Sequence, residues 1–223
     1  MNSKRLTQIT LALILSFFSS CSHQSSEKEG RPTQTQSLSS ISDIDHAPEV
    51  VDADKKYADA FKLLDGHWKG GFMIFVDQRG QQEGQAELLS IEQLRKSEDF
   101  SVSLELQVDQ WYTSESPYFQ RVKVRDVYPD GKIEESVGVN KVQDGKLFCI
   151  VKKPTDLVIH DGRLDGRDTI IWTRSRKTPK AVEYFRESVS EDSYVISGYG
   201  YYGDEDLDKK PRMHFYAEYK KIK

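Results

Sequence analysis

The feature of this sequence that most limits its possible folds is the alternation of apolar and polar residues in short segments separated by turn residues. In residues 102–108, Val or Leu at even positions alternates with Ser, Glu or Gln at odd positions, which predicts a strand with one buried face. Pro129-Asp130-Gly131 is a typical turn sequence, and Asp144-Gly145 predicts a hairpin between residues 132–142 and 146–152. The other segments that we predict as strands are 72–76, 85–94, 118–128, 169–174, 182–189, 194–202 and 212–220.

These segments make about ten short strands at regular spacing, the pattern of an all-β barrel or sandwich. Residues 56–64 predict a short N-terminal helix, because their apolar side chains recur at helical spacing. No later segment has the pattern of a long amphipathic helix. The pattern alone therefore predicts an all-β domain and leaves two architectures open, a closed barrel and a two-layer sandwich.

The N-terminus predicts export. Lys4 and Arg5 precede a short apolar run at residues 9–18, and two serines and Cys21 follow it, which is the plan of a secretory signal over residues 1–20. The position of Cys21 resembles the lipobox of bacterial lipoproteins. That resemblance implies acylation of Cys21, with palmitate among the acyl chains, and a membrane as partner through this lipid anchor. An ordinary secreted protein is the alternative.

The residues that follow the predicted signal indicate a tether. By the same resemblance, Ser22 in place of an aspartate implies sorting to the outer membrane of a Gram-negative host. Residues 21–55 are rich in Ser, Gln, Thr, Glu and Lys and lack an apolar period, so we expect a disordered tether. The folded domain is then predicted to cover residues 56–223.

Composition limits the partners. The 223 residues include 32 Lys and Arg against 36 Asp and Glu, a formal net charge of −4, which lacks the positive excess that drives binding to nucleic acid. We expect a monomer that binds no nucleic acid.

Two cysteines cannot form a disulfide-rich scaffold. The second, Cys149, lies in the apolar run 147–151, which predicts a small buried side chain and not a reactive thiol.

The start of the predicted domain carries a family resemblance. Leu64-Asp65-Gly66-His67-Trp68-Lys69-Gly70 resembles the L-x-G-x-W-x-G opening of lipocalin-like, or calycin, barrels. The resemblance implies a single up-and-down antiparallel barrel in which a short helical turn and Trp68 close one end. A basic side chain of the last strand is then expected on the indole ring, with Arg212 and Lys220 as candidates. Gly66, Trp68 and Arg212 form the predicted floor of the barrel.

Motifs of catalysis and metal binding are absent from the sequence. It has no His-Glu-x-x-His, no paired cysteine spacing, no Gly-x-Ser-x-Gly and no phosphate-binding glycine loop, so we expect neither an enzyme nor a metal site. His67 and His160 are predicted as surface histidines, with His160 in a turn over residues 159–162. The carboxylates at 204, 206 and 208 predict a solvated loop, because the distal Glu of a calcium loop is missing.

His214 leaves a second function open. The closing segment resembles the last strand of nitrobindin-like haem barrels, which implies haem ligated by His214 and nitric-oxide or peroxynitrite chemistry. The alternation argues against it, because Met213, Phe215, Ala217 and Tyr219 form the apolar face and His214 should point outward. The leading prediction is a non-catalytic barrel without cofactor. It would bind a small apolar or amphipathic ligand or serve as an interaction domain.

Overall fold

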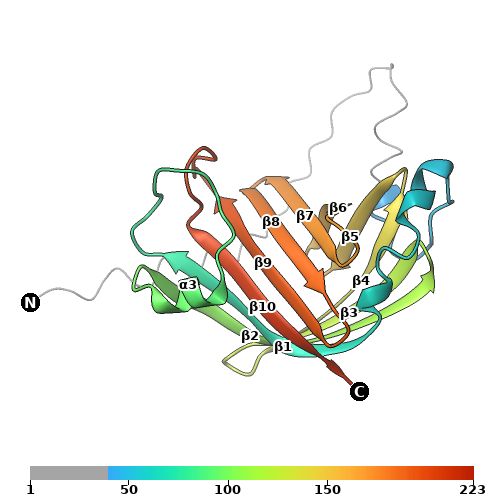
Figure 1. Cartoon of the computed structure of the whole chain (residues 1–223), viewed down its shortest axis with the longest axis horizontal. Coiled ribbons are helices and arrows are strands. Elements are labelled where there is room, and N and C mark those ends of the chain that lie inside the picture. The colour runs from blue at the N-terminus through green and yellow to red at the C-terminus, as the bar shows by residue number, and fades with distance from the viewer. Residues whose placement is uncertain (1–39) are drawn as a thin grey trace, which may run out of the picture.

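The computed structural model describes residues 40–223 and contains one closed antiparallel β-barrel (Figure 1). The strand order is β1-β10-β9-β8-β7-β6-β5-β4-β3-β2, so each strand pairs with its neighbours in sequence and β1 closes the sheet against β10. This confirms the predicted all-β, up-and-down barrel and excludes the sandwich. The strands are β1 (Gly66–Asp77), β2 (Phe100–Ser116), β3 (Phe119–Val127), β4 (Ile133–Gln143), β5 (Lys146–Lys152), β6 (Leu157–Leu164), β7 (Thr169–Lys177), β8 (Lys180–Val189), β9 (Ser193–Tyr202) and β10 (Met213–Ile222).

Three short helices begin and end within residues 40–223: η1 (Asp52–Tyr57), η2 (Lys62–Leu64) and α3 (Ile91–Lys96). The first two are 3-10 turns, so the predicted single helix over 56–64 is wrong in its bounds. None of the helices in the described part of the chain is long and apolar enough to cross a membrane. The predicted signal over 1–20 and the lipidation of Cys21 lie outside the described residues.

Two predicted elements are wrong. The strand predicted at 85–94 is a loop followed by α3, because Ser90 and Gln93 form a capping box that begins a helix: the Ser90 hydroxyl accepts from the Gln93 N–H, and the Gln93 side chain accepts from the Ser90 N–H. The turn predicted at 159–162 is the middle of strand β6. Gly162 permits close packing there, since a Cβ at this position would lie 2.3 Å from the Trp172 ring.

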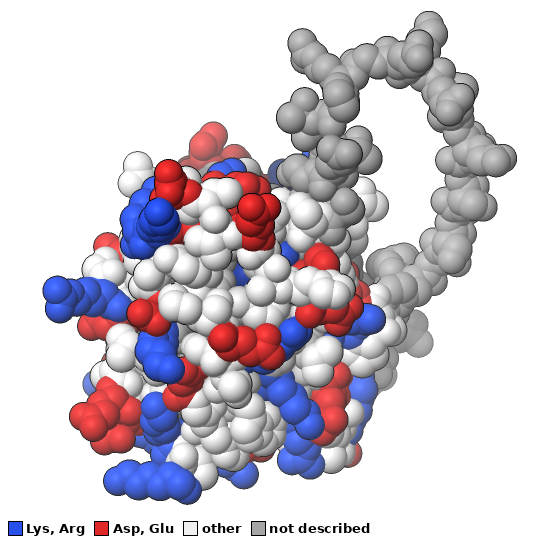
Figure 2. All heavy atoms as spheres, turned by 90° about the vertical axis from the view of Figure 1, so that its right-hand side faces the viewer, with Lys and Arg blue, Asp and Glu red and all other residues white. Residues whose placement is uncertain are grey.

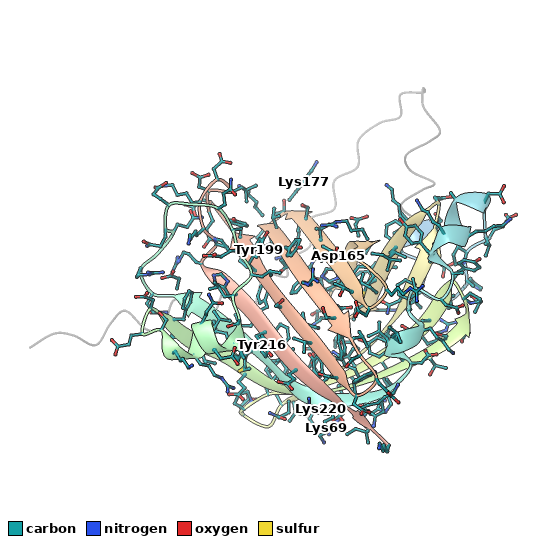
Figure 3. The ribbon with its side chains drawn as sticks, in the orientation of Figure 1. Lys69, Asp165, Lys177, Tyr199, Tyr216 and Lys220 are labelled. Atoms are coloured by element: carbon teal, nitrogen blue, oxygen red, sulfur yellow. The ribbon has the colours of Figure 1, made fainter. Side chains whose placement is uncertain are left out.

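The two ends of the barrel differ. In Figure 3, Lys69 and Lys220 mark the end where β1 begins and β10 ends, and Lys177 marks the opposite end. We call the first the closed end, because η1, η2 and their neighbours pack against the main core cluster there. Trp68 is fully buried at this end, and its indole N–H donates to the Leu64 carbonyl at 2.6 Å.

The cation beside Trp68 is not the one that we predicted. The Nζ of Lys221 lies 5.1 Å from the ring centroid, because Lys221 is the register partner of Trp68 on β10. Arg212 precedes the first residue of β10 and therefore lies at the opposite end of the barrel, so its assignment to the barrel floor is wrong. Lys220 pairs with Glu218 on the exposed face.

Residues 40–55, which the composition placed in a disordered tether, lie on the barrel. Ile41 and Ile44 pack against an outer-wall cluster of β3, β4 and β5. Lys141, only 1% exposed, donates from Nζ to the carbonyls of Ser40 and Asp43, each at 2.9 Å. Composition did not predict this segment, because its partners are about a hundred residues away in sequence.

Surface charge follows the balanced composition. Figure 2 shows acidic and basic side chains interspersed over the face that it presents, with uncharged surface between them. The ion pairs on the described residues are mostly between exposed side chains, such as Lys123 with Glu135 and Lys220 with Glu218. Such pairs contribute little to stability.

Candidate functional site

The inner wall of the barrel is defined by the strand register. Partners on neighbouring antiparallel strands point to the same side of the sheet, so the side chains in register with buried Trp68 face the interior. Near the closed end the inner-wall side chains Tyr112, Leu147 and Tyr194 are buried. From the middle toward the open end the inner wall is mixed: Ile74, Ala181 and Glu183 are buried, whereas the following side chains are only half-buried: Phe72, Leu104, Val124, Tyr128, Cys149, His160, Arg174 and Phe185.

The partial exposure of these inner-wall side chains shows where the barrel interior has free space. A half-buried side chain on an outer wall is ordinary, but these side chains point into the barrel and are surrounded by its wall. Accessible area at such positions means that the interior is packed near the closed end and incompletely filled around these side chains. We call the incompletely filled part the open half. Most of its lining is apolar, and a few polar groups project into it, as in many small-molecule sites.

Cys149 and His160 are direct partners on β5 and β6, and both face the open half. The His160 ring meets Phe185 edge-on, with centroids 5.5 Å apart. Burial, aided by the positive charge of Arg174, lowers the pKa of His160 to about 3, so its imidazole is neutral at pH 7. Burial also raises the pKa of the Cys149 thiol. The pair therefore does not ionise to a thiolate and an imidazolium, which argues against a nucleophilic role.

Glu187 lies on the inner wall toward the closed end, where it pairs in register with Ile170 and Ile196 at the inner limit of the open half. Its Oε1 accepts a hydrogen bond from the Tyr194 hydroxyl at 2.8 Å, and Tyr112 lies beside Tyr194 with 3.4 Å between the hydroxyl oxygens. Burial raises the pKa of Glu187, which favours the neutral carboxyl. A neutral carboxyl can both donate and accept a hydrogen bond, so it can bind an uncharged polar group.

Charged groups gather on the inner wall near the open end. Arg174 Nη1 lies 3.3 Å from Glu183 Oε2, and the Tyr202 hydroxyl donates to Glu183 Oε1 at 2.6 Å. Arg174 also reaches Asp156, between β5 and β6, at 3.4 Å. The interior therefore changes from apolar in the middle to charged at its mouth.

The sequence did not predict this site, because it placed His160 in a turn. The apolar residues 157–159 are the local signal that could have indicated a strand, but Asp161-Gly162 follows them and is typical of turns. His67 lies on the outer wall of β1, where its Nε2 is 3.0 Å from Asp109 Oδ1 and its ring stacks on Trp111. It is half-buried, and not in open solvent as we expected.

His214 is on the outer wall of β10, in register with Phe75, as the alternation predicted. It is 4% exposed, because the connection between β1 and β2 covers it and Phe100 packs edge-on at 5.3 Å. A haem inside the barrel could not reach this ring through the wall. Among the histidines of residues 40–223, His160 is the one on the inner wall.

Within residues 40–223, no three His, Cys, Asp or Glu side chains lie close enough together to hold a metal ion. The carboxylates at 204, 206 and 208 belong to the loop between β9 and β10. Asp206 there accepts from the Gln81 side chain with its carbonyl and donates to it with its N–H.

The class that the fold defines is a closed ten-stranded antiparallel β-barrel. No protein-family model matches the sequence, and no curated protein matches it. Among solved structures, Rv2717c from M. tuberculosis is 13% identical with a TM-score of 0.45, over 78% of this chain and 100% of that chain. The redesigned β-barrel mFAP0, bound to DFHBI, is 12% identical with a TM-score of 0.34, over 71% of this chain and 99% of its own. At these values the likeness concerns the fold alone.

Proposed function

We propose that the barrel binds a small amphipathic molecule in the open half of its interior. The observation that carries this proposal is the residual exposure of several inner-wall side chains from the middle of the barrel toward its open end, among them Phe72, Leu104 and Val124. An apolar body would contact Phe72, Leu104 and Phe185. A polar group would lie toward Glu187 or toward the charged mouth at Arg174.

Binding without catalysis is the proposed role. The inner-wall groups that could do chemistry have pKa values shifted away from it: His160 is neutral over the physiological range and Cys149 stays a thiol. We further propose that the chain is an exported lipoprotein held to a membrane through acylated Cys21. This part rests on the sequence of residues 1–21 alone.

A matched pair of substitutions tests the site. Val124 on β3 faces the interior and is half-buried, whereas Val137 on the neighbouring strand β4 faces outward and is 49% exposed. The probe is 1-anilinonaphthalene-8-sulfonate, which has an aromatic body and one charge. We expect Val124→Trp to weaken its binding at least about tenfold by filling the open half, and Val137→Trp to leave it unchanged.

Circular dichroism and thermal melting establish that both variants fold, and Cys149→Phe replaces Val124→Trp if the latter does not. Equal affinity in the parent and in a folded, interior-filled variant would refute the interior site. Loss of binding in both Val→Trp variants would place the dye on the outer surface and refute it as well.

A haem on the inner wall is the second candidate. It is favoured by the neutral imidazole of His160, since neutral imidazole is the form that ligates iron. Hemin added to the full chain should then give a Soret band that His160→Ala removes and His214→Ala keeps. A spectrum that is the same in the parent and in His160→Ala would exclude this candidate.

A further inference from the structure

One carboxyl group on the inner wall of the barrel has no partner. Asp126 lies on β3, two residues after Val124 and in register with Val108 on β2 and Glu134 on β4, so its side chain points into the barrel. The residue is only 8% exposed. Within residues 40–223, no hydrogen bond or ion pair reaches its carboxyl group. Burial of a carboxylate is costly unless the group is paired, so an unpaired one beside free space points to a ligand.

The carboxyl group of Asp126 keeps contact with the open half. Neither of its oxygens is among the sealed, unpaired side-chain atoms of the described residues, unlike the hydroxyl oxygen of Ser136 on β4. Val124 and Tyr128 are the next residues of β3 and its end on the same face, and both are half-buried. Free interior space therefore borders Asp126 on both sides, next to the neighbouring strand β4 (Figure 1).

Two lysines near this part of the inner wall are paired with Glu134 and not with Asp126. Lys153 Nζ lies 3.6 Å from Glu134 Oε1, and Lys132 Nζ lies 3.7 Å from Glu134 Oε2. Lys132 Nζ also lies 5.0 Å from the centroid of the Tyr128 ring. Burial raises the pKa of Asp126, and the positive charge of Lys153 offsets only part of this effect. The surroundings thus leave the negative charge of Asp126 without full compensation.

The charged groups at the mouth of the barrel already have partners. Arg174 lies 3.3 Å from Glu183 and 3.4 Å from Asp156. An anionic ligand would have to compete with these carboxylates for the guanidinium group. A cation at Asp126 would gain an ion pair without breaking one, and this difference favours a positively charged ligand.

We propose that the ligand of the interior is an amphipathic amine, whose ammonium group binds the carboxylate of Asp126 while its apolar body lies in the open half. This inference rests on the proposed function, because it names the chemistry of the molecule that the open half binds. An ammonium group suits the position, since it brings a positive charge together with N–H donors for the two carboxylate oxygens.

The test uses the full chain and three probes that share a naphthalene ring and differ in charge: naphthylmethylamine, naphthylmethanol and naphthylacetate. Calorimetry at neutral pH, where the amine is protonated, gives the affinities. We expect the amine to bind at least about tenfold more tightly than the alcohol, and the carboxylate to bind most weakly. Asp126→Asn removes the charge and keeps the size of the side chain, so it should lower the ratio of amine to alcohol affinity at least about tenfold.

Glu135→Gln is the matched control, because Glu135 lies on the same strand as Glu134 but faces outward, with a side chain that is 56% exposed. It should keep the affinity ratio of the parent. Thermal melting shows whether the variants fold, and Asp126→Ser replaces Asp126→Asn if the latter does not. Asp126→Asn should not lower the melting temperature, since no hydrogen bond or ion pair is lost.

The alcohol separates the two proposals. Its binding should weaken at least about tenfold in Val124→Trp, which fills the open half. If it does, but the parent binds the amine no better than the alcohol, the proposed function stands and the amine inference is refuted. An affinity ratio that is unchanged in a folded Asp126 variant refutes the inference in the same way. If Val124→Trp weakens none of the probes, the proposed function fails and the inference fails with it.

Discussion

The substitution His160→Gln tests the inner-wall assignment through the pH dependence of stability. In the folded chain, burial and Arg174 lower the pKa of His160 to about 3, whereas an unfolded histidine titrates near about 6.5. Between these values the unfolded state binds a proton that the folded state does not bind. The free energy of unfolding therefore falls as the pH falls from about 6.5 toward 3, and it is unaffected by His160 above this window.

The size of the effect follows from the shift. Each pH unit below the unfolded pKa costs about 1.4 kcal/mol, so His160 alone should remove about 2 kcal/mol between pH 7 and pH 5. Such a loss is large for a domain with a free energy of unfolding of about 5–15 kcal/mol. Glu187 acts in the opposite sense, because its raised pKa makes the folded state bind a proton more readily as the pH falls. Glu187 is present in both the parent and the variant, so its contribution cancels when the pH dependences of their free energies of unfolding are compared.

The assay is urea denaturation followed by tryptophan fluorescence at pH 7.5, 6 and 5. Glutamine keeps a polar side chain but does not titrate, so His160→Gln should lose less stability than the parent on going to pH 5, by about 2 kcal/mol. The control is Val137→Gln on the exposed face, which should follow the pH dependence of the parent. Parallel curves for the parent and His160→Gln would refute a buried, neutral imidazole on the inner wall.

Two further predictions follow from named contacts, and a third follows from the sequence of residues 1–21. Trp68→Ala should lower the free energy of unfolding by about 3–5 kcal/mol, seen as a lower melting temperature; an unchanged melting temperature would show that the indole does not close the barrel. Asp54→Ala should cost about 1–3 kcal/mol in urea denaturation, because the fully buried carboxylate accepts from the N–H groups of Val51 and Gly145. Cys21→Ser should abolish palmitate labelling and release the protein from the membrane fraction, and tight membrane association of this variant would contradict the lipoprotein proposal.

Much of the fold could be predicted from local patterns. Alternation at 102–108 and the Asp144-Gly145 turn indicate strands and a hairpin without knowledge of distant contacts. The resemblance around Trp68 then implied closure of the sheet. The same local reading could have found α3, since Ser90 and Gln93 have the spacing of a capping box.

The candidate site could not be predicted in this way, because it depends on which strands meet. Gly162 looks like a turn residue until the Trp172 ring from β7 is placed on it. The pairing of His160 with Cys149 is a matter of register between β5 and β6. Lys221 was missed for a similar reason, because the offset between β1 and β10 decides which cation meets the indole.

The docking of residues 40–45 on the outer wall has a mechanical consequence. The Ser40 hydroxyl accepts from Gln143, the last residue of β4, so the chain joins the barrel beside its closed end. A pulling force applied through the chain upstream of residue 40 would thus act first at the packed end, on the contacts of Lys141 and Arg121. It would act on the strands only after these contacts break. The mouth of the barrel lies at the end opposite to this junction, so the force would not act directly on it.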